Sequence, residues 1–474
     1  MRQLLVFSLA ATLGACVAGA PPEIATPAPE LPQQFAYQGD ATINASVADL
    51  LPSEDPAYQT LSNAALANGP SLAEALSRVE AARAGARRSG AERLPLLGLD
   101  GAVIGTRINP NQFGDGAAAG GFIDTEQVSY GANLVASWDA DVFGRLKAQE
   151  RAALARVDTA SASANAVRIA LLAEIAGSVT DWRVLEARGA SIKSDVDAAS
   201  QLAALAKKRE DAGIAPGFDR VRAEAAASAS RSRLAGLQSE RVRIVGRLIT
   251  LTGQSAADVN AALASDGKAL SPAAAPAAPA ALPSDLLTNR PDVLAAASEL
   301  TATDADLAAA ARARFPRLTL SGVLGLLAFN PADLLDEESI IGTLTAGVAA
   351  PLLDFGRIEA EIDGAAANKK IAFAAYRGAV FQALGDAEAA YGLIEASDAE
   401  AELAMQEQRE LERAARLAGT RFRAGLSNFL EVLEARRAAD ASGERAAAAI
   451  GRAHRARILL WQALGGDSSS APEG

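Results

Sequence analysis

The 474-residue sequence predicts a mixed α and β fold that is built from two similar halves. Three observations predict this fold: motifs that recur in the same order, short segments in which apolar and polar residues alternate, and two very long stretches without proline. Half of the residues are hydrophobic and only 4% are aromatic, which suits long Ala- and Leu-rich helices better than a β-sandwich or a ligand pocket. We therefore expect helices to dominate the fold.

Few residues are available for metal, redox or acid–base chemistry. The chain has one His (His454), one Cys (Cys16) and two Met, so it lacks the residues for a zinc site, a disulfide framework or a His-based triad. The net charge of −12 disfavours nucleic acid as a partner. From residue 21 onward no uninterrupted apolar stretch approaches the length of about 18 residues that a transmembrane helix needs. We expect a protein that is not an enzyme and holds no metal.

The amino terminus predicts export from the cytoplasm. A basic residue at Arg2 precedes an apolar stretch from Leu4 to Leu13, as in a secretory signal peptide. Leu13-Gly14-Ala15-Cys16 resembles the bacterial lipobox, which makes residues 1–15 a lipoprotein signal peptide and Cys16 the lipidated residue. The alternative is an ordinary signal peptide that happens to contain Cys. Residues 16–70 then form a lipid-anchored tether, which begins with a Pro-rich stretch.

The chain contains an internal duplication. An R-x-P-x-L-x-L-x-G motif starts at Arg93 and again 221 positions later at Arg314, and other landmarks recur 212 positions apart. These landmarks are Phe143-Gly144-Arg145 with Phe355-Gly356-Arg357, Gly213 with Gly425, and Leu251-Thr252-Gly253 with Ala463-Leu464-Gly465. The matches predict a first repeat over 71–264, a Pro/Ala linker over 265–283, a second repeat over 284–466 and a tail over 467–474.

Each repeat contains two segments with the alternation of β-strands. We expect strands at about 94–106 and 127–139 in the first repeat, and at about 317–328 and 341–353 in the second. One apolar and one polar face over about 10 residues is typical of a transmembrane strand, but a half-buried soluble hairpin has the same pattern. Four strands cannot close a barrel, so if they span a membrane several chains must contribute.

A long helix and a shorter return helix follow the strands of each repeat. The predicted long helices are 145–212 and 357–424, with no Pro, and each is on the order of 100 Å long. The predicted return helices are 216–252 and 426–465. Apolar and Ala residues recur at three- and four-residue spacing, which predicts antiparallel coiled-coil packing. Gly213 and Gly425 are placed to end the long helices at the far tips of the two hairpins.

This plan, together with a few motifs, resembles the TolC-like outer-membrane channel family. The motifs are Asn289-Arg290-Pro291-Asp292, Arg314-Phe315-Pro316, Pro351-Leu352-Leu353-Asp354-Phe355-Gly356-Arg357 and Phe429-Leu430-Glu431-Val432-Leu433-Glu434-Ala435. The lipobox indicates the lipoprotein branch with OprM-like and NodT-like proteins. The resemblance implies a homotrimer whose four strands per chain form a 12-stranded outer-membrane β-barrel, continued by an α-helical barrel across the periplasm.

The function that the resemblance implies is that of the exit duct of a tripartite efflux system. The partners would be a periplasmic adaptor (membrane fusion protein), an inner-membrane pump of the resistance-nodulation-division (RND) type, and outer-membrane lipid. The covalent lipid on Cys16 would be the only attached group, and the chain would need no cofactor. One alternative is the outer-membrane component of a type I protein secretion system. Another is a lipid-anchored coiled-coil interaction protein without a pore.

The resemblance also implies where the periplasmic opening is controlled. Glu431 and Glu434 occupy the positions of two luminal acids, so that a trimer would present six carboxylates to passing ions. Asp219 and Phe422 match residues that hold the tip closed, although Phe422 replaces a frequent Tyr. The predicted adaptor contacts are Arg209, Gly213, Arg421, Gly425 and Ser427. The alternative explanations are favourable helix-dipole interactions and ordinary turn chemistry.

A Gly-rich segment over 114–121 lies between the first two predicted strands. It lacks the Lys of a phosphate-binding loop, and we expect an extracellular loop rather than a phosphate site.

Overall fold

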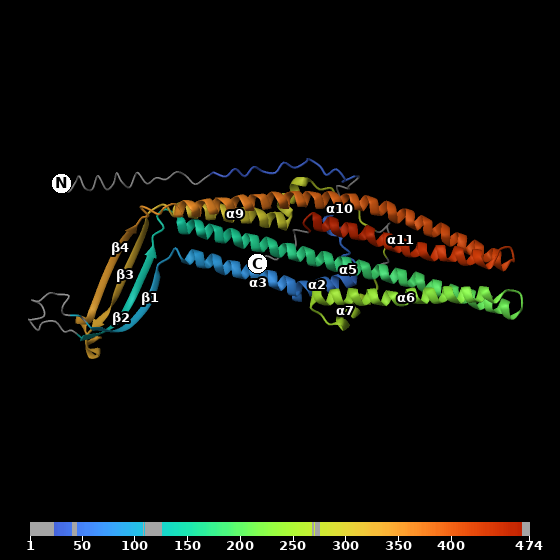
Figure 1. The fold of residues 1–474 in the computed structure, drawn as a ribbon, viewed down its shortest axis with the longest axis horizontal. Coiled ribbons are helices and arrows are strands. Elements are labelled where there is room, and N and C mark those ends of the chain that lie inside the picture. Colours follow the sequence, from blue (N-terminus) through green and yellow to red (C-terminus); the bar gives the residue numbers. More distant parts are fainter. Residues whose placement is uncertain are drawn as a thin grey trace, which may run out of the picture. The chain divides into compact units, whose positions relative to one another are not determined.

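A computed structural model describes residues 23–39, 45–107, 109, 126–267, 270 and 275–466 (Figure 1). The described chain divides into two compact units, which are treated separately below. The first comprises Met1–Pro27, Glu80–Asp158 and Ser298–Ala374, and the second comprises Ala28–Val79, Thr159–Ala297 and Ala375–Gly474. The predicted lipidation site at Cys16 and the Gly-rich loop at 114–121 lie outside the described residues.

The first unit contains one four-stranded antiparallel sheet in the order β1-β2-β3-β4. The strands are β1 (Leu96–Arg107), β2 (Glu126–Asp139), β3 (Arg317–Ala328) and β4 (Ile340–Ala349). The hairpins β1–β2 and β3–β4 come from the first and second repeats, and β2 pairs with β3 to join them. The outer edges of β1 and β4 pair with no strand among the described residues.

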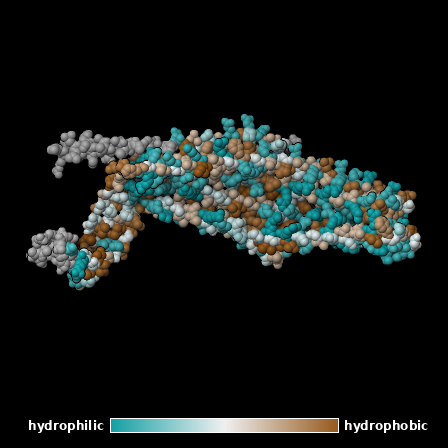
Figure 2. All heavy atoms as spheres, in the orientation of Figure 1, coloured by the Kyte–Doolittle hydropathy of each residue, from teal (hydrophilic) through white to brown (hydrophobic). Residues whose placement is uncertain are grey.

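The register brings one set of alternating, mostly apolar positions from all four strands onto the same face of the sheet. Leu99 pairs with Leu134, Leu134 pairs with Leu324, and Leu324 pairs with Gly342. Apart from Arg107 and Glu126, which pair with each other at the loop end of the β1–β2 hairpin, this face contains only apolar and aromatic side chains and glycines among the described residues. The other face is mixed and carries the polar residues Asp100, Gln127, Ser129, Asn133, Ser137, Thr319, Ser321, Thr343 and Thr345. Many of the large apolar side chains are exposed, and few hydrophilic residues interrupt the sheet in Figure 2.

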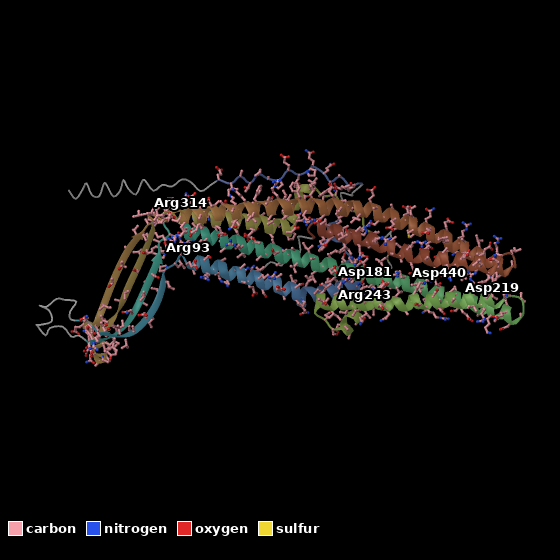
Figure 3. The ribbon with its side chains drawn as sticks, in the orientation of Figure 1. Arg93, Asp181, Asp219, Arg243, Arg314 and Asp440 are labelled. Carbon is pink, nitrogen blue, oxygen red and sulfur yellow. The ribbon has the colours of Figure 1, made fainter. Side chains whose placement is uncertain are left out.

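The duplicated R-x-P motif fixes the chain where it enters each hairpin. Arg93 forms an ion pair with Glu150 near the start of α5 (Arg145–Asp211), and Arg314 pairs with Glu359 near the start of α10 (Arg357–Arg423) at 2.5 Å. Figure 3 labels both arginines. The strand β1 begins after Pro95, and β4 ends at Ala349, four residues before the predicted end, because Pro351 cannot donate a ladder hydrogen bond.

Long helical hairpins dominate the second unit. Helices α5 (Arg145–Asp211) and α10 (Arg357–Arg423) have 67 residues each, and they are followed by α6 (Gly217–Thr252) and α11 (Phe429–Ala463). Helix α11 starts three residues later than predicted, because the Asn428 side chain accepts a hydrogen bond from the Glu431 amide and caps the helix there. By length and composition α5 could also cross a membrane, but half of its apolar window is buried in the structure, as in a packed core helix.

The core of the second unit lies where several helices meet. Fully buried side chains include Leu61, Ile175, Leu248, Leu263 and Leu460. They come from α2 (Pro56–Asn68), α5, α6, α7 (Ala256–Leu263) and α11 in turn. The shorter elements are α3 (Pro70–Ala91), α8 (Leu286–Asn289), α9 (Pro291–Arg312), and the 3-10 turns Val47–Leu50, Pro283–Asp285, Pro331–Asp333 and Glu337–Ser339.

Helix α2 differs from the tether that the sequence predicts for residues 16–70. Asp55 caps it, and its buried residues Ala57, Tyr58, Leu61 and Ala65 follow a helical spacing that packs into the core. The tether is therefore shorter than predicted, because this part of it belongs to the folded unit.

Candidate functional site

Both helical hairpins turn through the same backbone structure. Gly213 and Gly425 have φ angles of +72° and +75°, a conformation that side chains disfavour. The amides of Ile214 and Leu426 each donate a 2.8 Å hydrogen bond back to the carbonyls of Arg209 and Arg421. The duplicated glycines therefore produce duplicated helix ends, as the spacing of 212 predicts.

The predicted acidic pair lies in the first two turns of α11. Glu431 and Glu434 are both exposed, whereas the intervening Val432 and Leu433 are buried. Among the described residues neither carboxylate has a hydrogen bond or an ion pair of its side chain. The two carboxylates thus point away from the packing of their own chain, one helical turn apart, and remain available to ions in solution.

Phe422 is held in a small apolar cluster near the turns, which we call the tip cluster: Ala206, Ala223, Ala226, Phe422, Phe429, Val432 and Leu433. The Phe422 ring meets the Phe429 ring edge to face at 5.9 Å, and the Arg209 guanidinium lies 4.7 Å from the Phe422 centroid. Phe422 therefore contributes packing and a cation–π contact in place of the hydroxyl of a Tyr.

Asp219 is half-buried in the first turn of α6 (Figure 3). In the described part of the chain its side chain has neither a hydrogen bond nor an ion pair, so no contact of this kind links it to Phe422. The neighbouring Arg220 instead binds Glu210, at 2.6 Å, and Glu224, at 2.9 Å. The structure brings Phe422 and Arg209 together and leaves Asp219 apart.

The turns also expose apolar side chains. Ile214, Phe218, Val221 and Leu426 are all more than half exposed, although they lie beside charged residues. Arg421 donates to the carbonyl of Leu426 at 3.4 Å, and the Ser427 hydroxyl lies 3.5 Å from the carbonyl of Ala418. This tip surface, formed by residues 209–221 and 421–427, offers both apolar and cationic contacts.

The Asn-Arg-Pro-Asp motif has a structural role. Arg290 is buried and donates to the last-turn carbonyl of Ala463 at 3.1 Å, and it pairs with Asp292 at 2.6 Å and Asp386 at 3.0 Å. It thereby joins the start of α9 to α10 and to the end of α11. Burial alone would raise the pKa of Asp292, but the hydrogen bonds and charge of Arg290 hold that pKa below its ordinary value.

One charged cluster in the second unit was not predicted from the sequence. Asp195 on α5 and Asp440 on α11 are both buried, and they lie among Arg188, Arg233, Arg436 and Glu444. A possible signal was the position of two acids on the faces that α5 and α11 use for packing, where apolar residues are the rule.

Known proteins with similar sequences and structures identify the family of this chain. The model of the family described as outer membrane efflux protein matches residues 61–254 and 282–466, that is, both repeats. The chain is 28% identical to the pyoverdine export outer membrane protein OpmQ of Pseudomonas aeruginosa, over all of this chain and 98% of that relative. It is 30% identical to the outer membrane protein OprJ of the same species, over 81% of this chain and 78% of OprJ. The solved structure of the outer-membrane channel OprN superposes with a TM-score of 0.84 at 24% identity, over 94% of this chain and 99% of that one.

Proposed function

The chain belongs to the outer membrane efflux protein family, and we propose that three copies of it form the exit duct of a tripartite small-molecule efflux system. The family confirms the outer-membrane location and the TolC-like fold that the sequence predicts. It also excludes the alternative of a coiled-coil protein without a pore.

The observation that carries the proposal is the sheet with one predominantly apolar face and two edges that pair with no strand among the described residues. In the bilayer every unpaired backbone group costs several kcal/mol, so an open four-stranded sheet cannot remain exposed to lipid. Spanning barrels need about eight strands or more. Three copies supply twelve strands, with the apolar face toward lipid and the face that carries Asp100 and Asn133 toward the lumen.

The internal repeat predicts how the copies join. Strand β4 corresponds to β2 shifted by 212 positions, and β1 corresponds to β3 shifted by 221, so the β2–β3 seam is a template for β4 against β1 of the next copy. The pair Leu134–Leu324 of the template becomes Ala346 opposite Val103. This register keeps the apolar faces continuous around the barrel, because both residues belong to that face.

Disulfide cross-linking tests this arrangement. The double variant Ala346→Cys/Val103→Cys should form covalent dimers and trimers on mild oxidation, because opposite residues in a sheet place their Cβ atoms within disulfide range. In the matched control Ala346→Cys/Leu99→Cys the second cysteine stands about 13 Å along the strand and should remain reduced. Cross-linking of the control alone would show a different register, whereas a purified protein that stays monomeric in detergent and in lipid would disprove the duct.

Cys16 carries the lipid anchor in this proposal. The position of Ile24 supports it, because Ile24 packs against Leu307, Ile358 and Ile362 in the same unit as the sheet. The eight Cα-to-Cα steps from Cys16 to Ile24 span at most about 28 Å, so the lipidated residue lies within that distance of Ile24. Mass spectrometry should find acyl chains on the wild-type amino terminus and none on a Cys16→Ser variant.

The tip surface is the docking site for a periplasmic adaptor, and the pump behind it is of the RND type. Support comes from the exposed apolar and cationic side chains at the turns and from relatives such as OpmQ, described as a pyoverdine export protein. Energy comes from the pump, so this chain acts as a passive conduit without catalytic groups. Co-purification with an RND-type or an ATP-driven pump separates small-molecule efflux from the alternative of type I protein secretion.

A further inference from the structure

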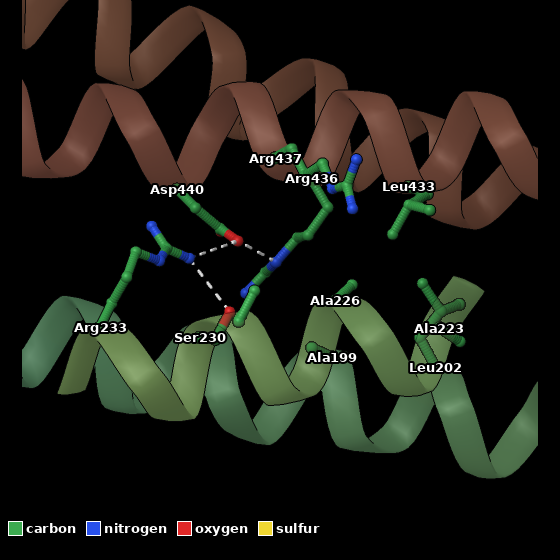
Figure 4. Close-up of a pocket in the computed structure, with 11 residues that line it drawn as sticks. Ala199, Leu202, Ala223, Ala226, Ser230, Arg233, Leu433, Arg436, Arg437 and Asp440 are labelled. Atoms are coloured by element: carbon green, nitrogen blue, oxygen red, sulfur yellow. Dashed lines mark hydrogen bonds and ion pairs between the residues drawn. The ribbon is translucent and has the colours of Figure 1, made fainter. Parts of the chain in front are cut away.

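The two repeats meet within the second unit through helices α5 and α11. These helices approach each other closely: a Cβ placed on Gly451 of α11 would stand 2.5 Å from a Val184 methyl of α5. Near the tip cluster the same pair of helices buries two carboxyl groups, Asp195 on α5 and Asp440 on α11, with exposures of 5% and 7%. A cavity of about 260 Å³ adjoins Asp440 (Figure 4).

The guanidinium groups around this pair make only long contacts with it. Arg436 lies 3.7 Å from Asp195 and 3.4 Å from Asp440, and Arg233 lies 4.0 Å from Asp440. The short bonds of Arg233 go elsewhere, to Glu444 at 2.6 Å and to the Ser230 hydroxyl at 3.0 Å. The Oδ2 atom of Asp195 is buried and accepts no hydrogen bond in the described part of the chain.

The charges of the cluster do not balance. Ion pairs link three guanidiniums, from Arg188, Arg233 and Arg436, to four carboxyl groups, from Asp195, Asp440, Glu240 and Glu444. Arg437 also lines the cavity, but its side chain is exposed to solvent and forms no ion pair within the described part of the chain. Helix α10 adds Gln408 near Gly443, and Glu407, which Arg445 neutralises at 2.6 Å. One proton would bring the cluster to neutrality and would give the orphan oxygen of Asp195 a hydrogen bond to its neighbour.

The geometry points to a buried proton-binding site shared by Asp195 and Asp440, which fastens the first repeat to the second behind the tips and loosens when the proton leaves. Burial raises the pKa of Asp195 to about 7, together with the hydrogen bond that a protonated carboxyl can share with Asp440 and the negative charge of Asp440. Ser230, Arg233, Arg436 and Asp440 line the adjoining cavity, which is large enough for water, so the proton can exchange without unfolding of the helices.

The direction of the pH effect follows from the raised pKa. A carboxyl whose pKa in the folded protein exceeds its ordinary value of 3.8 favours the packed state at low pH, and this contribution is lost as the pH rises through about 7. Asp440 lies six residues, or about 9 Å along α11, from Glu434. Loss of the proton therefore weakens the contact between α5 and α11 close to the opening. Any effect of this change on conductance rests on the proposed function as a duct.

Difference infrared spectroscopy of the full-length protein tests for the proton itself. At about pH 6 ordinary Asp and Glu side chains are ionised, so the carbonyl band of a protonated carboxyl should come from this pair and should disappear above about pH 8. Asp195→Asn and Asp440→Asn should each abolish the band. Glu400→Gln, which removes an exposed ion pair with Arg452, is the matched control and should keep it. A wild-type protein without the band, or a band that survives both substitutions, overturns the inference.

Hydrogen exchange measures the consequence for the helices. After correction for intrinsic rates, wild-type peptides from residues 188–212 and 429–446 should exchange several-fold faster above about pH 8 than at about pH 6. Asp195→Asn should stay protected at both pH values, because an amide keeps a hydrogen bond to Asp440 without titrating. Equal exchange of the wild type at both pH values would refute the fastening role. This measurement does not depend on conductance, so a protein without a channel would disprove the duct and leave the proton site testable.

Discussion

Phe143 stacks on Phe315 with ring centroids 4.8 Å apart and planes 12° from parallel. This contact joins the turn after β2, in the first repeat, to the segment before β3, in the second. The repeat counterpart of Phe143 is Phe355, which is 90% exposed, and the counterpart of Phe315 is Leu94, which is 66% exposed. The aromatic contact is therefore made within the chain between Phe143 and Phe315, whereas the side chains of the counterparts Phe355 and Leu94 are exposed.

Removal of the Phe355 ring should weaken assembly of the copies. We expect Phe355 to pack on Leu94 of the neighbouring copy, so Phe355→Ala should destabilise the trimer by about 1.5–3 kcal/mol per interface. Melting of the trimer on semi-native gels at several protein concentrations would measure the loss. Phe143→Ala is the control and should lower the stability of each protomer instead. A Phe355→Ala trimer as heat-resistant as the wild type would show that the two seams differ.

Neutral substitutes for the acidic pair should change ion selectivity. The double variant Glu431→Gln/Glu434→Gln should reduce the preference for cations several-fold in planar bilayers, because exposed carboxylates attract cations at a narrow opening. Reversal potentials in a salt gradient provide the measurement, and Glu412→Gln, in an ion pair with Arg416, serves as control. Unchanged reversal potentials in the double variant would place the selectivity elsewhere in the duct.

Removal of Arg290 should be strongly destabilising. Arg290→Ala removes the buried guanidinium that pairs with Asp292 and Asp386 and donates to the Ala463 carbonyl, which should cost about 1.5–3 kcal/mol in thermal or denaturant unfolding. Arg290→Lys should recover only part of this loss, because an ammonium cannot serve three acceptors with the geometry of a guanidinium.

The same ion pair predicts sensitivity to acid. Since the pKa of Asp292 is lowered, its contribution to stability is present above its ordinary pKa of about 4 and is lost as the pH falls below it. The difference in stability between wild type and Arg290→Ala should therefore shrink on acidification. A difference that stays constant down to about pH 3 would contradict this account.

A side chain at the glycine of the tip turn should destabilise the turn. Gly425→Ala should cost about 1–2 kcal/mol, because φ is +75° although nothing lies within 4 Å of the added Cβ. Gly419→Ala, in the interior of α10 and equally free of neighbours, should instead stabilise the helix by about 0.5–1 kcal/mol. Hydrogen exchange at residues 415–430 measures both effects, and two variants that behave alike would rule out the turn geometry as the cause.

Much of the fold could be predicted because it depends on local periodicity. Alternation and the absence of Pro located the strands and the long helices, and the recurrence of Gly213 as Gly425 located the turns. The pairing of β2 with β3 and the burial of α2 could not be predicted, because they depend on contacts between distant parts of the chain.

The candidate site was predictable to a smaller extent. The exposed positions of Glu431 and Glu434 agree with their spacing on one helix face, but the partner of Phe422 proved to be Arg209. Asp195 and Asp440 escaped notice because 245 positions separate them, and each alone looks like a surface acid on a charged helix.

The equal length of α5 and α10, 67 residues each, limits how the gene can change. Insertion of one turn into α5 alone would advance its end by about 5 Å relative to that of α10 and misalign the two turns that must act together. A change of length is tolerated only when the other copy changes by the same amount. The duplication therefore requires two stretches of coding sequence that lie 212 codons apart to change in length together.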